Sequence, residues 1–222
     1  REVFKSIISP ILYSGFSGIF LVATNPVDIM TRVVWQLSGF DCRKVIGSGT
    51  TLDTARLRYL LGEHFDVDPK NVHAYVIGEH GDSEMVPWSQ AMIGTKPIQE
   101  IIDSKKEKFS VENLENIAHD VTRAAYKIIE AKKATYYGIG LALVRIVKAI
   151  FGNENSILTV TTMLRGEYGI NEVFVGVPCI LGRDGVKEVM TLHLTPEEEK
   201  KFQDSCKLLN KVWKDSCLAD EK

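Results

Sequence analysis

One segment, Ile19–Thr24, is almost wholly apolar, and it limits the possible folds more than any other part of the sequence. A short apolar run without alternation is typical of a strand that is buried on both faces of a sheet. The preceding segment, Glu2–Tyr13, has apolar residues at roughly helical spacing, and Ser14, Gly15 and Gly18 separate the two. A helix that leads into a buried strand indicates an α/β fold.

Helices and strands continue to alternate after this strand. Asn25 and Pro26 end it, and Pro26 suits the first position of a predicted helix over Val27–Leu37. Further strands are predicted at Val45–Ile46, Val72–Ile77, Met92–Ile93, Ile157–Met163, Val173–Leu181 and Val186–Leu194, and further helices from Leu52, over Val111–Lys133 and Ile139–Phe151, and from Thr195 to about Cys217. Arg183-Asp184-Gly185 predicts a hairpin, and Thr195 followed by Pro196 predicts a helix start.

The chain of 222 residues is 45% hydrophobic, which is enough for a sizeable core. Its formal net charge of −2 gives no general attraction for nucleic acid or an anionic membrane, and we expect neither as a partner. The sequence shows no signal-peptide pattern and no long apolar stretch, so we expect a cytoplasmic protein. Four widely spaced cysteines, without a Cys-x-x-Cys pair, predict neither a metal site nor a disulfide framework.

The candidate catalytic residue is His80, in the stretch Gly78–Ser89 that follows the predicted strand Val72–Ile77. Open α/β sheets bind ligands at the carboxyl ends of their strands. Asp53 and Arg56 are three residues apart, so a helix places them on one face. A histidine can take and return a hydroxyl proton, a buried aspartate can orient it, and an arginine can bind a carboxylate through two hydrogen bonds. These three groups suit the oxidation of a small 2-hydroxy acid.

Each of these residues also has a plain structural interpretation. Asp53 in a first helical turn is favoured by the helix dipole, and Arg56 is then its salt-bridge partner. Asn25 and Thr135 each precede a predicted helix, so either is also a candidate helix cap. A hydrolase that uses His80 with Asp53 is much less favoured, because the sequence has no Gly-x-Ser-x-Gly motif.

Four motifs carry a resemblance that covers nearly the whole chain. They are Asn25-Pro26-Val27-Asp28, Gly47-Ser48-Gly49-Thr50 with Leu52-Asp53-Thr54-Ala55-Arg56, Gly78-Glu79-His80-Gly81-Asp82 with Pro87-Trp88-Ser89, and Ala134-Thr135-Tyr136-Tyr137-Gly138. In order and spacing they resemble the L-lactate dehydrogenase family. The resemblance implies the C-terminal part of a Rossmann-type NAD-binding domain over residues 1–48, followed by a mixed α+β substrate domain over residues 49–222.

The resemblance also implies residue roles for the interconversion of lactate and pyruvate with NAD. His80 is then the proton acceptor and donor, Asp53 its partner and Arg56 the anchor of the substrate carboxylate. Asn25 contacts nicotinamide and substrate, Thr24 lies beside it in the cofactor site, and Thr135 forms a wall of the substrate pocket.

Two further residues have a role implied only by the bacterial members that fructose 1,6-bisphosphate activates. In those enzymes an arginine and a histidine at the motif positions of Arg58 and His73 bind the effector across a subunit interface. The alternative is an exposed arginine and an ordinary histidine. If this site is functional the protein is oligomeric, and we expect a homotetramer.

The sequence lacks a Gly-x-Gly-x-x-Gly motif after a strand, which seats the pyrophosphate of a dinucleotide. Because the chain begins with Arg1, and the resemblance begins after the family's mobile loop, we expect the preceding βαβ units to lie outside these 222 residues and these residues alone to be inactive. The loop that separates lactate from malate enzymes is also absent. A malate dehydrogenase of the same fold and a non-catalytic interaction module therefore remain alternatives.

Overall fold

The computed structural model describes residues 2–132 and 136–216. Its strands are β1 (Phe20–Val22), β2 (Val45–Gly47), β3 (Val72–His73), β4 (Met92–Ile93), β5 (Lys96–Pro97), β6 (Ser156–Arg165), β7 (Asn171–Gly182) and β8 (Gly185–Val189). Its α-helices are α1 (Glu2–Tyr13), α2 (Val27–Ser38), α3 (Thr51–Phe65), α4 (Ile98–Ser104), α5 (Val111–Lys132), α6 (Tyr137–Phe151) and α7 (Pro196–Asp215). Short 3-10 turns lie at Cys42–Lys44, Pro69–Asn71, Trp88–Gln90 and Glu167–Gly169.

The main sheet has five strands in the order β1-β2-β6-β7-β8. β1 and β2 run parallel, and the other neighbours are antiparallel. β2 joins the parallel pair β1–β2 to the antiparallel strands through the pairing of Gly47 with Thr161. A Cβ atom on Gly47 would overlap the Thr31 hydroxyl oxygen and would lie only 2.8 Å from the Thr161 Cβ. Glycine at position 47 therefore lets α2 and β6 pack directly against β2.

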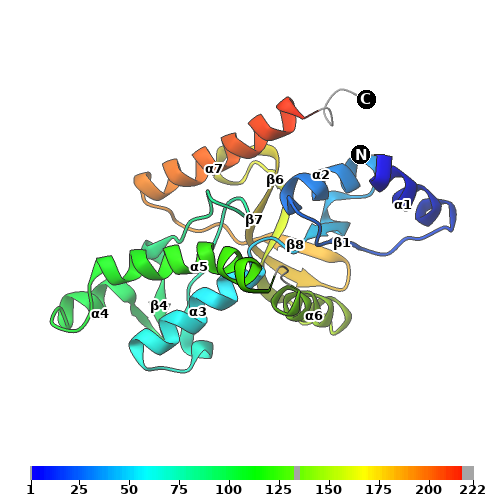
Figure 1. The fold of residues 1–222 in the computed structure, drawn as a ribbon. Coiled ribbons are helices and arrows are strands. Elements are labelled where there is room, and N and C mark those ends of the chain that lie inside the picture. Colours follow the sequence, from blue (N-terminus) through cyan, green and yellow to red (C-terminus); the bar gives the residue numbers. More distant parts are fainter. Residues whose placement is uncertain (1, 133–135, 217–222) are drawn as a thin grey trace.

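Helices cover both faces of this sheet. Figure 1 shows α2 and α7 on one face and α6 on the other. β7 is buried from Val173 to Cys179 without interruption, and its side chains join those of the three helices in one hydrophobic core. Coverage on both faces explains why the sequence of this strand is apolar rather than alternating.

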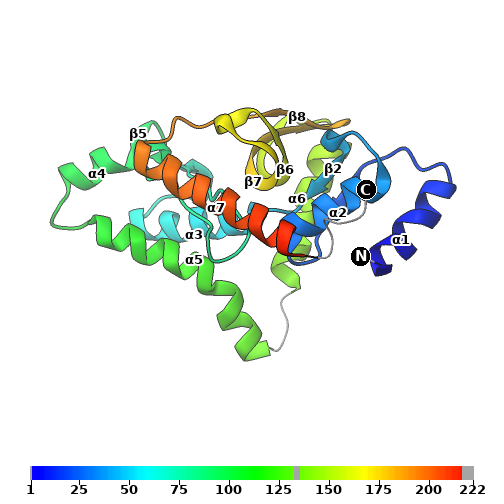
Figure 2. The same ribbon diagram turned by 90° about the horizontal axis from the view of Figure 1, so that it is seen from above.

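A smaller lobe carries a second sheet, in the order β3-β4-β5. Figure 1 shows it with α3, α4 and α5 at the end of the molecule away from α1, and Figure 2 shows the same separation from above. Its core is a separate cluster that includes Leu57 and Leu61 of α3, Ile98 and Ile102 of α4, and Val121 of α5. The long helix α5 therefore has its own apolar partners.

The predicted α/β class, the hairpin and the helix start at Thr195 are confirmed. Gly182 pairs with Gly185 across Arg183 and Asp184. Thr195 accepts a hydrogen bond from the Glu198 amide, and the Glu198 side chain accepts one from the Thr195 amide, so both halves of a capping box are present.

Three local predictions are wrong. The strand expected over Val72–Ile77 ends at His73, the last residue of β3. Beyond it, the Thr54 hydroxyl accepts a hydrogen bond from the Val76 amide, and the Thr50 hydroxyl donates one to the Val76 carbonyl. The strand expected to reach Leu194 ends at Val189, and the chain then turns toward Tyr168, whose hydroxyl accepts the Leu192 amide.

The third error concerns the start of α2. The helix begins at Val27, so Pro26 is the residue before it and not its first member. The capping position therefore belongs to Pro26, and the interpretation of Asn25 as a helix cap is wrong.

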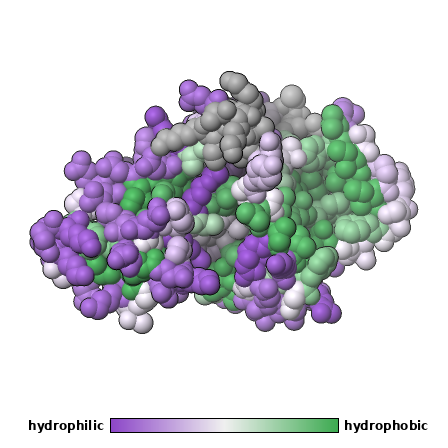
Figure 3. All heavy atoms as spheres, turned by 60° about the horizontal axis from the view of Figure 1, so that its bottom comes forward, coloured by the Kyte–Doolittle hydropathy of each residue, from purple (hydrophilic) through white to green (hydrophobic). Residues whose placement is uncertain are grey.

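Several large hydrophobic side chains remain exposed along α6. Leu141, Val144 and Phe151 are 72%, 49% and 79% exposed. Figure 3 shows hydrophobic residues gathered on the face that carries this helix. Among the described residues, no helix is both long and apolar enough to cross a lipid bilayer.

Candidate active site

His80 lies in a loop that is held by three other elements of the fold. The Gly78 amide donates to the Gly176 carbonyl of β7, at 2.9 Å. The Glu79 amide donates to the Ser205 hydroxyl of α7 at 2.9 Å, and the His80 amide donates to a carboxylate oxygen of Asp28 in α2 at 2.8 Å. His80 thus follows an isolated bridge and not a long strand, yet its main chain is firmly anchored.

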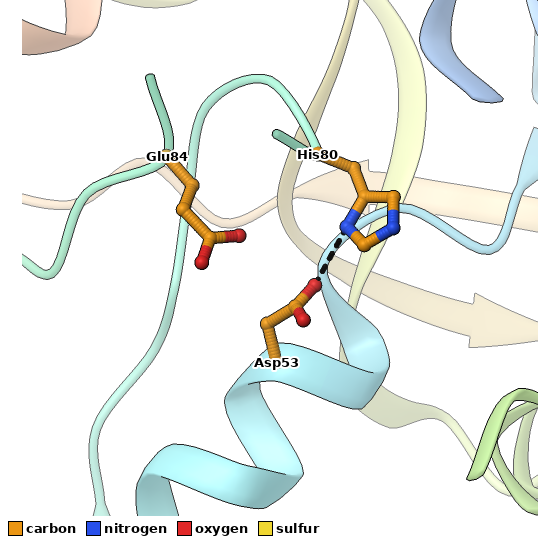
Figure 4. Close-up of side chains that lie close together, drawn as sticks. All are labelled: Asp53, His80 and Glu84. Atoms are coloured by element: carbon orange, nitrogen blue, oxygen red, sulfur yellow. Dashed lines mark hydrogen bonds and ion pairs between the residues drawn. The ribbon is translucent and has the colours of Figure 1, made fainter. Parts of the chain in front are cut away.

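The imidazole of His80 is bound to Asp53, as the sequence predicts. Its Nδ1 lies 2.8 Å from Oδ2 of Asp53, which is in the first turn of α3 and only 3% exposed. Figure 4 shows this contact and the other ring nitrogen, Nε2, pointing away from Asp53. Burial disfavours the charged ring, but the hydrogen bond and charge of Asp53 outweigh it and raise the pKa of His80 above 6.5.

Arg56 shares a helix face with Asp53, which confirms the geometry expected from their spacing. Its Nη1 is 3.4 Å from Oδ1 of Asp53, and its side chain is 18% exposed. A contact of this length is weak for a charged pair. The guanidinium therefore keeps donors for a further anion beside His80.

Two carboxylates near His80 were not predicted from the sequence. A carboxylate oxygen of Glu84, a carboxylate oxygen of Asp53 and a ring nitrogen of His80 all lie within 4.8 Å of one another. Burial, followed by the charge of Asp53, raises the pKa of Glu84 to about 8. Nothing in the sequence distinguishes Glu84 from an ordinary surface acid, because only the fold brings it to the Asp53 side of the loop.

Asp28 is the second of these carboxylates, and it is 2% exposed. One oxygen accepts the His80 amide, and the other accepts the Thr161 hydroxyl of β6 at 2.6 Å. Burial raises its pKa to about 6 against the effect of these hydrogen bonds. Its place in the motif Asn25-Pro26-Val27-Asp28 was the only available signal.

Asp53, His80 and Glu84 are also a possible set of metal ligands, although the sequence predicts no metal. The Nδ1 atom of His80 already makes its hydrogen bond to Asp53. A metal bound through Nδ1 would have to replace that bond. The observed pairing therefore suits proton transfer better than metal binding.

The other predicted site residues fall in several places. Thr24 and Asn25 are exposed just beyond the carboxyl end of β1. The predicted pocket residue Thr135 lies outside the described residues. Arg58 donates to the Ala74 carbonyl at 3.0 Å, and His73 is exposed in β3.

Three raised pKa values predict that stability falls as the pH rises. Between the ordinary pKa of 4.5 and the folded pKa of about 8, Glu84 holds its proton more tightly in the native than in the unfolded chain. The native state then binds more protons, so the free energy of unfolding decreases with pH. Asp28 acts likewise between 3.8 and about 6, and the raised pKa of His80 acts above 6.5.

We therefore expect a lower urea midpoint at pH 9 than at pH 6. Glu84→Gln should flatten this dependence, since the amide does not titrate. Glu115→Gln, which changes an exposed residue of α5, is the control and should leave the slope unchanged. An equal slope in wild type and Glu84→Gln would contradict the assignment of the pKa of Glu84.

Comparison with known proteins gives consistent matches along nearly the whole chain. Residues 50–217 match the model of the lactate/malate dehydrogenase α/β C-terminal domain, and residues 1–47 match that of the lactate/malate dehydrogenase NAD-binding domain. The L-lactate dehydrogenase 2 of a Bacillus cereus strain is 53% identical over 211 residues, which are 95% of this chain and 67% of the relative. The L-lactate dehydrogenase of Geobacillus thermodenitrificans is 54% identical over 210 residues, with 95% and 66% covered.

Solved structures agree with these matches. A lactate dehydrogenase from a Medee basin deep-sea metagenome library has a TM-score of 0.93 at 49% identity, covering 96% of this chain and 68% of that one. The ligand-bound minor L-lactate dehydrogenase of Enterococcus mundtii has a TM-score of 0.92 at 46% identity, with the same coverage. This chain spans about two thirds of the length of its curated relatives.

Proposed function

Since the chain belongs to the lactate/malate dehydrogenase family of NAD-dependent oxidoreductases, we propose that the protein containing it is an L-lactate dehydrogenase. It interconverts (S)-lactate and pyruvate, with His80 as the proton acceptor and donor. The observation that carries this proposal is the 2.8 Å contact between Nδ1 of His80 and the buried carboxylate of Asp53. This contact fixes the tautomer that leaves Nε2 free to accept a proton.

The proton and the substrate carboxylate are handled by different side chains. When lactate is oxidised, Nε2 of His80 takes the hydroxyl proton, and Asp53 stabilises the resulting imidazolium. When pyruvate is reduced, the same nitrogen returns the proton to the carbonyl oxygen. Arg56, whose bond to Asp53 is long, binds the substrate carboxylate and holds the reacting carbon near His80.

Thr24 and Asn25 suit the cofactor because they are exposed where β1 ends beside the parallel strand β2. Ligands of open α/β sheets bind at this end of parallel strands. Bound there, the nicotinamide of NAD supplies the acceptor or donor of the hydride. Asn25 would lie between cofactor and substrate, and Thr135 would complete the substrate pocket.

We also propose a boundary near residue 48 between the NAD-binding part, residues 1–48, and the substrate domain, residues 49–222. The ranges of the two family models, 1–47 and 50–217, support this boundary. Asp28 and His80 lie on opposite sides of it and are joined by a hydrogen bond.

The deciding assay compares pyruvate with oxaloacetate as oxidants of NADH. We expect the protein that contains this chain to have a kcat/KM for pyruvate at least about a hundredfold higher. A preference for oxaloacetate would favour the malate dehydrogenase alternative. Turnover of neither substrate, by a folded protein that binds NAD, would favour a non-catalytic interaction module.

An effector site is the second part of the proposal. Arg58 lines a cavity of about 440 Å³ together with Lys70 and Arg145, and its guanidinium lies 4.9 Å from the Tyr75 ring centroid. Cationic side chains suit a phosphate ligand. We propose that Arg58 and His73 bind fructose 1,6-bisphosphate between subunits of a homotetramer. The exposed apolar residues of α6 also favour an assembly of subunits.

Arg58→Gln should abolish any decrease in the KM for pyruvate that fructose 1,6-bisphosphate produces. Light scattering should show a tetramer in the presence of the effector, and weaker effector-dependent assembly of the variant. Arg183→Gln, an exposed change on the β7–β8 turn, is the control. A wild-type protein that ignores the effector would refute this part while leaving the assignment of His80 intact.

A further inference from the structure

Asp28 makes an unusual connection to the His80 loop. It is a buried carboxylate, it lies 52 residues before His80, and it accepts the main-chain amide of His80 itself. Its second oxygen is occupied by the Thr161 hydroxyl. Both oxygens are therefore held, one by the loop and one by β6, so the carboxylate has a fixed orientation.

His80 is consequently held at two points, its main-chain nitrogen and one ring nitrogen. Asp28 of α2 binds the main-chain nitrogen, and Asp53 of α3 binds Nδ1 of the ring. A side chain fixed at its backbone and at one ring nitrogen has little freedom to redirect the other ring nitrogen. The direction of Nε2 thus depends on two helices and not on one.

We infer that Asp28 is a positioning residue for His80: its carboxylate, oriented by Thr161, fixes the loop so that the imidazole meets Asp53 with Nε2 facing the substrate. This inference rests on the proposed function for the role of Nε2. The anchoring itself depends only on the observed contacts.

Asp28 also adds charge to the surroundings of the imidazole. The groups that face its carboxylate are Thr161 of β6, His80 and Glu79 of the loop, and Cys206 of α7. When ionised, Asp28 favours the charged imidazole, as Asp53 does. A buried aspartate that served packing alone would not have to face the histidine.

Substitutions can separate position from charge. Asp28→Asn keeps an oxygen for the His80 amide, and its NH2 group can donate to the Thr161 hydroxyl oxygen, so position is kept and charge is lost. Thr161→Val keeps the charge and removes the hydroxyl that orients it. Asp28→Ala removes both. Asp41→Asn is the matched control, since Asp41 also accepts a main-chain amide, that of Arg43, but on the surface.

The first readout is NMR of labelled histidine rings, in which the His80 signals are identified by their loss in His80→Asn. Asp28→Asn should lower the pKa of His80 and keep its tautomer, whereas Thr161→Val and Asp28→Ala should shift the ring nitrogen signals. The second readout is catalysis. Asp28→Ala should reduce kcat about a hundredfold with a smaller change in KM, as misplacement by about 1 Å does, and Asp28→Asn should recover most of that loss.

The inference is overturned if Asp28→Asn and Thr161→Val both leave the pKa and ring signals of His80 as in wild type. These two variants preserve side-chain volume, so they decide the question even if Asp28→Ala does not fold. The NMR result is independent of turnover. A protein without lactate activity, whose His80 signals still respond to Asp28, would refute the proposed function and retain the anchoring.

Discussion

Replacing His80 with asparagine should reduce kcat for pyruvate by about 10²–10⁴-fold, the usual contribution of a general acid or base. Asparagine keeps the main-chain bond to Asp28 and has a similar polar character, but it cannot deliver a proton. The measurement is the rate of NADH oxidation at saturating pyruvate.

Two further observations make this result specific to proton transfer. Binding of oxamate, a carboxylate analogue of pyruvate, should change much less than kcat, because Arg56 remains. His119→Asn, on α5, is a control for the loss of an imidazole elsewhere. A His80→Asn variant within tenfold of wild type would show that another group moves the proton.

Replacing Arg56 should act on substrate binding. Arg56→Gln removes the charge and the forked donors that we propose bind the carboxylate, and losing one partner of such a pair costs about 2–5 kcal/mol. The KM for pyruvate should therefore rise roughly 30-fold to several thousandfold. Arg56→Lys should fall between wild type and Gln, since lysine keeps the charge and loses the fork.

The control for Arg56 is Arg43→Lys. Arg43 also pairs with an aspartate of its own segment, Asp41 at 2.6 Å, but on the exposed surface. Its replacement should leave KM unchanged. If Arg56→Gln raised KM less than about fivefold, the carboxylate would have to be bound by another residue.

Much of the fold could be predicted because periodicity and local signals agree with the tertiary structure. The continuously buried stretch Val173–Cys179 of β7 and the capping box at Thr195 are examples of such agreement. The predicted strand Val72–Ile77 failed for a physical reason. Its β-branched residues favour a strand, but hydroxyls of Thr50 and Thr54, at the start of α3, take the hydrogen bonds of Val76.

The candidate site also contains contacts that local sequence signals predict and contacts that only the tertiary structure determines. The contact of Asp53 with His80 could be expected, because the sequence places an acid at the start of a predicted helix and a candidate catalytic histidine in a loop after the next predicted strand. Asp28 and Glu84 could not, because their importance comes from burial beside His80, and burial depends on contacts distant in sequence. The roles assigned to Arg58 and His73 remain predictions.

The shared sheet has a consequence for how the enzyme can move. β2 is hydrogen-bonded to β1 on one side and to β6 on the other, and Gly47 lies in tight contact with Thr31 and Thr161. A hinge between the NAD-binding part and the substrate domain would have to separate neighbouring strands. We therefore predict that rigid-body domain closure is disfavoured at this seam, and that the entry of substrate and the release of product depend on surface loops.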